Sequence, residues 1–131
     1  MILSRSAIAD WYLRRSTVRH GLFRGLRLRS DVPNLARTKW AGTYERELSQ
    51  EIGSILATEP KVIFDIGAAE GYYAVGLLRR LPGCRCIAWE AREQRRHLLE
   101  SNALANGCRQ RLEIRGLCTA THLAEAKWQG M

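Results

Sequence analysis

An aspartate followed by two spaced glycines is the clearest candidate for chemistry in this chain. Asp65 ends an apolar stretch, and Gly67 and Gly71 follow it just before a helical pattern begins. A strand, a glycine turn and a helix build a ligand site at the carboxyl edge of a parallel sheet. Gly67 lets the backbone approach a ligand because glycine has no Cβ, and N–H groups at a helix start favour a carboxylate or phosphate. We therefore expect a small-molecule site here.

A second acid stands where a neighbouring strand is expected to end. Glu90 follows the stretch 84–89 and lies 19 residues beyond Gly71. A carboxylate at this place in a nucleoside-binding unit can accept hydrogen bonds from both ribose hydroxyls. The alternative is a solvated surface glutamate. The agreement of strand end, acid and upstream glycine turn favours a nucleoside site.

The spacing D-x-G-x-x-x-G in residues 65–71 resembles the first motif of class I S-adenosylmethionine-dependent methyltransferases. Residues 65–74 look most like the FkbM-like branch, which methylates oxygen on small molecules and sugars. The resemblance implies S-adenosyl-L-methionine as the cofactor and a small-molecule methyl acceptor. It also implies a set of cofactor-binding residues: Asp65, Gly67, Ala68, Gly71, Glu90 and Ala91. A dinucleotide dehydrogenase is disfavoured, because Ala69 stands where the G-x-G-x-x-G fingerprint needs its second glycine.

The resemblance also assigns roles within this set. Gly67 and Gly71 would make room for the methionine part, and Asp65 would orient the turn or meet the amino group through water. Glu90 would hold the ribose, and Ala91 would lie against adenine. No acid follows the third strand at 117–120, so Thr119 or a backbone group would meet the adenine amine. No residue is assigned a catalytic role.

Residues 40–45 also look like a lead-in to the FkbM-like cofactor domain. The resemblance implies that three residues near the cofactor line the pocket: Tyr44, Glu45 and Tyr72. The alternative is an ordinary amphipathic helix that packs on the sheet. Apolar residues at helical spacing predict that helix over 43–58, with Gly42-Thr43 at its start.

Alternating helical and strand patterns predict an α/β fold. Strands are expected at 62–65, 84–89 and 112–115, and helices at 71–81, 92–106 and 122–128, the last one capped by Thr119 or Thr121. Gly76 is expected to allow close approach of helix and sheet. The resemblance implies a Rossmann-like methyltransferase fold truncated to about three parallel strands, in the order 3-2-1, with flanking helices and an N-terminal helical extension. Residues 41–131 would be the amino-terminal half of that domain, incomplete as a methyltransferase.

Strand 62–65 would then be an exposed edge. Parallel strands are normally buried on both sides, so a bare apolar edge invites pairing with a protein partner or self-association.

The cysteines at 84, 86, 108 and 118 lack the spacing of a metal site and are interpreted as reduced thiols. The 131 residues, 46% of them hydrophobic, fit one soluble domain. No membrane span or secretory signal is recognised, and a cytoplasmic location is expected.

The net charge of +8 is concentrated in residues 1–40, where nine arginines and lysines face only Asp10 and Asp31. We expect residues 1–40 to form a basic helical arm, with a turn or linker at 31–34. The alternative function is a catalytically inactive methyltransferase-like module that binds RNA or acidic partners, with Trp11, Tyr12, Phe23 and Trp40 as stacking surfaces. The same aromatic residues are equally explained by core packing. A mitochondrial presequence is a further alternative for the first residues.

Overall fold

The computed structural model describes residues 16–31 and 33–129 of the chain. The helices and strands follow in the order α2 (Pro33–Ala41), η1 (Arg46–Leu48), α3 (Ser49–Ala57), β1 (Val62–Ile66), α4 (Tyr72–Arg80), β2 (Arg85–Trp89), α5 (Glu93–Ala105), η2 (Arg109–Arg111), β3 (Leu112–Arg115) and α6 (Ala120–Gln129). Every strand and helix predicted from residue 62 onward is present, with ends shifted by at most two residues. Within the described residues, no helix is both long and apolar enough to cross a membrane.

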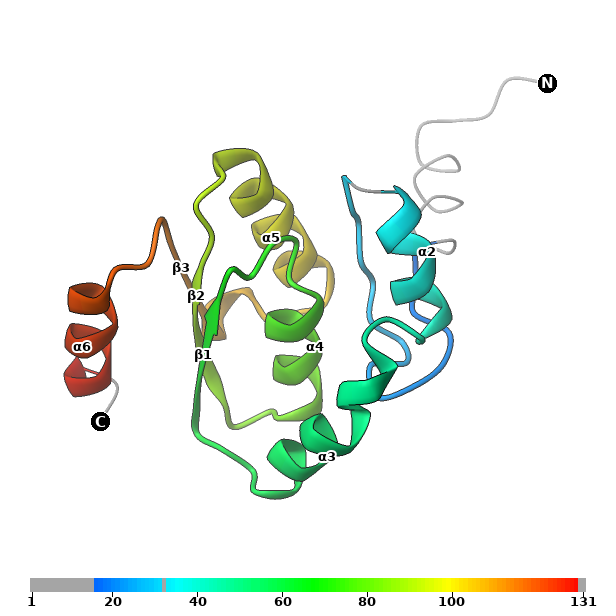
Figure 1. Ribbon diagram of the computed structural model, residues 1–131, viewed down its shortest axis with the longest axis horizontal. Coiled ribbons are helices and arrows are strands. Elements are labelled where there is room, and N and C mark those ends of the chain that lie inside the picture. The colour runs from blue at the N-terminus through cyan, green and yellow to red at the C-terminus, as the bar shows by residue number, and fades with distance from the viewer. Residues whose placement is uncertain (1–15, 32, 130–131) are drawn as a thin grey trace.

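The three strands form one parallel sheet in the order β1-β2-β3, as predicted. Phe64 pairs with Ile87 in register, and Ile66 at the end of β1 pairs with Trp89 at the end of β2. Helices α4 and α5 cover one face of the sheet, and α6 lies on the other (Figure 1). β1 is therefore an edge strand of the described sheet, where Phe64 is 37% exposed and Ile66 is 56% exposed.

The main apolar core lies between the sheet and the helices α4 and α5. It includes Val75 and Leu78 of α4, Leu99 of α5, and Cys86 and Ala88 of β2, all buried. A smaller cluster on the opposite face joins Ile87 and Trp89 to Ala126 of α6. The alternation of β2 residues between the two clusters follows from the period-two geometry of a strand, with both faces covered.

The prediction of a helical N-terminal extension is right for α2 but wrong for residues 16–31. These residues reverse direction, and Thr17 pairs antiparallel with Arg27. Gly21 and Gly25 both have positive φ, at 86° and 92°, which explains why the chain turns here instead of continuing a helix. Residues 1–15 lie outside the described residues. The expected turn at 31–34 is also revised, because α2 begins at Pro33, a favoured first helical position.

The reversed segment belongs to the main core. Val18, Phe23, Leu26 and Leu28 are buried there. Trp40 donates its indole N–H to the carbonyl of Leu28 at 2.8 Å. Both described aromatics that were considered as stacking surfaces, Phe23 and Trp40, thus pack against the protein, whereas Trp11 and Tyr12 lie outside the described residues. Core packing is the interpretation that fits.

Two predictions about local chain geometry need correction. The helix expected over 43–58 does not begin at Gly42-Thr43: Glu45 is left-handed (φ 46°), and the 3₁₀ helix η1 precedes α3. The reason is a close chain crossing, since a Cβ on Gly42 would lie 1.9 Å from the carbonyl oxygen of His20. Gly76 does allow a close approach, but its neighbour is Phe23 rather than the sheet, because a Cβ added to Gly76 would lie 2.8 Å from the Phe23 ring.

Candidate functional site

The turn between β1 and α4 contains two glycines with different surroundings. Gly67 and Gly71 both have positive φ, at 76° and 100°. A Cβ on Gly71 would lie 2.6 Å from the Cδ1 atom of Leu99, so this glycine is required by packing. A Cβ on Gly67 would meet no protein atom within 4 Å. Gly67 thus exposes backbone to open space, as a ligand-facing position would require.

The turn is hydrogen-bonded to the end of β2. The N–H groups of Gly67 and Ala68 donate to the carbonyl of Trp89, at 2.8 and 2.9 Å. The N–H of Ala69 donates to Oε1 of Glu90 at 3.1 Å. Ala69 has a φ of 51°, a strained value for a residue with a side chain. The carboxyl ends of β1 and β2 therefore form one connected edge that holds all of the predicted cofactor-binding residues.

Glu90 is held in place by the backbone around it. It is 7% exposed, and its second carboxylate oxygen accepts the N–H of Arg92 at 3.0 Å. The Arg96 guanidinium donates to the carbonyls of Glu90 and Ala91, at 2.8 and 2.9 Å. A carboxylate has about four acceptor positions. The N–H groups of Ala69 and Arg92 occupy two of those of Glu90, so about two stay available for a ribose diol. The side chain is fixed rather than solvated, unlike a surface glutamate.

Asp65 is the unusual titratable group of this edge. Burial is the main reason that its pKa rises from 3.8 to about 6, and the nearby Glu90 charge raises it further, while the Ala74 N–H lowers it. Within the described residues, its buried Oδ2 has no hydrogen-bond partner. A buried acceptor without a partner is costly, so it invites a donor from a ligand or a water.

Tyr44, Glu45 and Tyr72, the predicted pocket-lining residues, do come together. They line a hollow of about 20 Å³, room for about one water, along with Tyr73 and Phe23. The Tyr44 and Tyr72 rings meet edge to face with centroids 5.3 Å apart. Burial, followed by the proximity of Glu45, raises the pKa of Tyr44 to about 12. These rings fill the space beside the turn, and their role toward a ligand stays a prediction.

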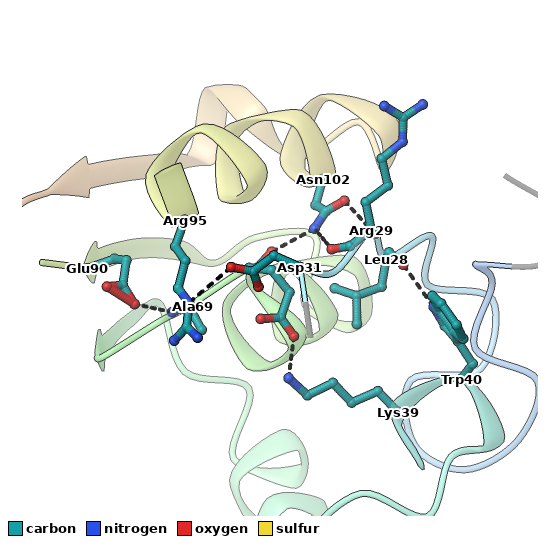
Figure 2. Close-up of polar contacts among 10 residues, drawn as sticks. Leu28, Arg29, Asp31, Lys39, Trp40, Ala69, Glu90, Arg95 and Asn102 are labelled. Atoms are coloured by element: carbon teal, nitrogen blue, oxygen red, sulfur yellow. Dashed lines mark hydrogen bonds and ion pairs between the residues drawn. The ribbon is translucent and has the colours of Figure 1, made fainter. Parts of the chain in front are cut away.

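Three residues that tie the turn to the rest of the chain were missed from the sequence: Lys39, Glu70 and Asn102. Lys39 of α2 forms a buried ion pair with Glu70, which lies within the glycine turn. Asn102 of α5 donates to the carbonyl of Glu70 at 2.8 Å and to that of Arg29 at 2.9 Å. Figure 2 shows these contacts beside the bond between Ala69 and Glu90. An acid inside a glycine turn was the one available signal.

Thr119 has a local role at the start of α6. Thr119, considered as an adenine contact, accepts the N–H of His122 at 3.2 Å and so caps α6. A larger hollow of about 410 Å³ lies along β3 and includes Arg85, Glu113 and Arg115, but none of the predicted cofactor-binding residues. The four cysteines are free thiols, and the described residues contain no group of three or more side chains suited to hold a metal.

The three-stranded parallel sheet with its flanking helices shares the Rossmann-like fold of class I methyltransferases, as the following comparisons show. Residues 48–127 match the family described as the precorrin methyltransferase domain, and the chain belongs to this family. A comparison with curated protein sequences gives no match.

Solved structures support the same fold. An O-methyltransferase from Bacillus cereus, in complex with SAH, is 25% identical with a TM-score of 0.51 and covers 56% of this chain. The O-methyltransferase TomG from Streptomyces achromogenes, in complex with SAM, is 20% identical over 77% of this chain, with a TM-score of 0.58. A hypothetical protein of Thermus thermophilus is 20% identical over 87%, with a TM-score of 0.57. This chain spans 34%, 43% and 62% of these three proteins, respectively.

Proposed function

We propose that this chain binds S-adenosylmethionine and forms the cofactor-binding part of a methyltransferase. The observation that carries the proposal is the hydrogen bond between Glu90 and Ala69, at 3.1 Å. It brings a buried carboxylate at the end of β2 against a glycine turn at the end of β1, the arrangement that binds nucleosides at the edge of a parallel sheet.

The residues present fit this cofactor. Gly67 leaves open space beside the backbone, and Asp65 has a buried oxygen without a partner among the described residues. Glu90 would accept the ribose hydroxyls with its remaining lone pairs, and Ala91 would lie against adenine. Asp65 would accept a hydrogen bond from the amino group, directly or through water. When bound, the cofactor supplies an activated methyl group, while these residues position it.

We propose a hydroxyl of a small molecule or sugar as the methyl acceptor. The likeness of residues 65–74 to the FkbM-like branch supports an oxygen acceptor, and so does the structural similarity to the Bacillus cereus O-methyltransferase. The family description names precorrin instead, which makes a precorrin the competing acceptor. An assay with labelled cofactor and both acceptor classes separates these choices.

Isothermal titration of S-adenosylhomocysteine into the protein tests the binding proposal. We expect saturable binding that Glu90→Gln weakens about tenfold, because the amide loses a charged acceptor for the ribose diol. Glu93→Gln is the matched control, since Glu93 begins α5 shortly after Glu90 and its side chain is 78% exposed, and this variant should bind like the wild type. Equal affinities for both variants and the wild type would exclude the assigned role of Glu90.

We also propose that the open edge of β1 pairs with a strand from a partner or a second copy. Separately, we propose that the protein is cytoplasmic. The partial exposure of Phe64 and Ile66 on an edge strand supports the first proposal. Sedimentation analysis of the wild type and Ile66→Lys tests it for self-association. A larger species that the substitution converts to monomer is expected, and a monomeric wild type would restrict the proposal to other partners.

A further inference from the structure

Lys39 and Glu70 form an ion pair whose two side chains are almost completely buried. Their side chains are 7% and 3% exposed. Lysine is rarely buried unless it is paired, and removing one partner of a buried pair leaves an uncompensated charge. The pair joins α2, which follows the reversed chain segment, to the end of the turn that precedes α4 (Figure 2). Such a contact is specific, because a buried charge has few alternative partners.

Two aromatic rings lie close to the Lys39 ammonium group. Its Nζ atom lies 4.6 Å from the centroid of the Tyr44 ring and 5.9 Å from that of Tyr72. Aromatic faces attract a cation at these distances. The carboxylate of Glu70 and the rings of Tyr44 and Tyr72 thus surround one ammonium group at the turn.

A second connection links the same elements. We use the term N-terminal segment for residues 16–31 and 33–41. The Asn102 side chain accepts the N–H of Arg29 at 2.9 Å and donates to the carbonyls of Arg29 and Glu70. Glu70 is therefore fixed to the N-terminal segment through its side chain and, by way of α5, through its backbone.

This fixed residue adjoins the most strained position of the turn. Ala69 precedes Glu70, has a φ of 51°, and donates its N–H to Glu90. A left-handed alanine persists only where its surroundings hold it. A continuous path of contacts consequently runs from Lys39 through Glu70 and Ala69 to Glu90, the proposed ribose-binding residue.

From this path we propose that Lys39 is a positioning residue, through which docking of the N-terminal segment and cofactor binding stabilise each other. The inference rests on the proposed function, because it deepens the account of the same site. By linkage, a segment that strengthens cofactor binding must itself be held more firmly when cofactor is bound. This reciprocity supplies two independent measurements.

The first measurement is the affinity for S-adenosylhomocysteine, at a temperature where each variant is folded. Lys39→Met should weaken binding about tenfold, within the usual range for coupled sites. The double variant Lys39→Met/Glu70→Met removes both charges, so its stability should recover toward that of the wild type, but its affinity should stay low because no ion pair holds the turn. Asp31→Asn, which removes the partly exposed pair between Asp31 and Arg95, is the control and should bind normally.

The second measurement uses the wild type and so does not depend on whether a variant folds. Bound S-adenosylhomocysteine should slow hydrogen exchange at the amides of Val18 and Leu28, which close the reversed segment through bonds to Leu26 and Ser16, both 2.8 Å long. Wild-type binding without this protection would overturn the inference. So would normal affinity in Lys39→Met, or recovery of affinity together with stability in the double variant. A folded wild type that binds no S-adenosylhomocysteine would overturn the proposed function as well.

Discussion

The backbone N–H of Ala69 donates a hydrogen bond to the carboxylate of Glu90 across 21 residues of sequence, at 3.1 Å. This bond connects the end of one strand to the end of its neighbour, and it uses only part of the acceptor capacity of Glu90. The two residues therefore form a rigid base beside the open face of Gly67. Rigid placement of binding groups on strand ends lowers the entropy lost when a ligand binds.

Gly67 and Gly107 offer a matched pair of substitutions, because both have positive φ and open space where a Cβ would lie. Gly67 and Gly107 have φ of 76° and 69°, and a Cβ at either would meet no protein atom within 4 Å. Gly67→Ala and Gly107→Ala should therefore cost similar stability, about 1 kcal/mol. Only Gly67→Ala should weaken S-adenosylhomocysteine binding, by about tenfold or more, because its methyl group enters the space assigned to the ligand. Calorimetry and thermal unfolding measure both quantities, and equal affinities would place the ligand elsewhere.

The raised pKa of Asp65, about 6 against an ordinary 3.8, predicts a pH-dependent contribution to stability. The folded protein binds this proton more tightly than the unfolded chain does, so the stabilisation is complete below about pH 4 and is lost as the pH rises through about 6. Asp65→Asn should thus be more stable than the wild type at about pH 7.5, by about 1–3 kcal/mol, and the gain should shrink toward about pH 4. Urea unfolding at both pH values measures it.

Asp31→Asn is the control for this series, because Asp31 is on the surface. It should change the free energy of unfolding by less than about 0.5 kcal/mol at either pH. A variant Asp65→Asn that is no more stable than the wild type at the higher pH would show that Asp65 has a satisfied partner in the folded protein.

The glycines of α3 and α4 test the packing of the reversed segment. A Cβ on Gly76 would lie 2.8 Å from the Phe23 ring, whereas a Cβ on Gly53 would meet nothing within 4 Å. Gly53→Ala should stabilise the protein by up to about 1 kcal/mol through its helix propensity. Gly76→Ala should destabilise it by about 1–3 kcal/mol through overpacking. If both variants gained stability in thermal unfolding, Phe23 would not pack on α4.

The sheet and its edge could be predicted because their signals are local. Asp65, Gly67 and Glu90 stand directly at strand ends, and β3 coincides with its predicted range, Leu112–Arg115. The lead-in was less predictable, since the start of α3 depends on a crossing between Gly42 and His20 that no local pattern encodes.

Of the residues that connect the N-terminal segment to the turn, only Glu70 had a sequence signal, as an acid inside a glycine turn. Lys39 and Glu70 are 31 positions apart, and a lysine among arginines suggests a solvated charge. Residues 16–31, expected to be helical as part of the basic arm, instead reverse direction, with positive φ at Gly21 and Gly25. Burial of Val18 and Phe23 depends on the chain reversal, which is a tertiary property.

The most direct test of the cofactor site is an amide NMR titration of the folded protein with S-adenosylhomocysteine. We predict saturable shifts that are largest at Gly67, Ala69 and Ala91, with small shifts at Glu113 and Arg115 along the larger hollow. A folded protein whose Gly67 and Ala69 amides do not move at saturating ligand would contradict the proposed site, because the turn would then be a structural feature alone.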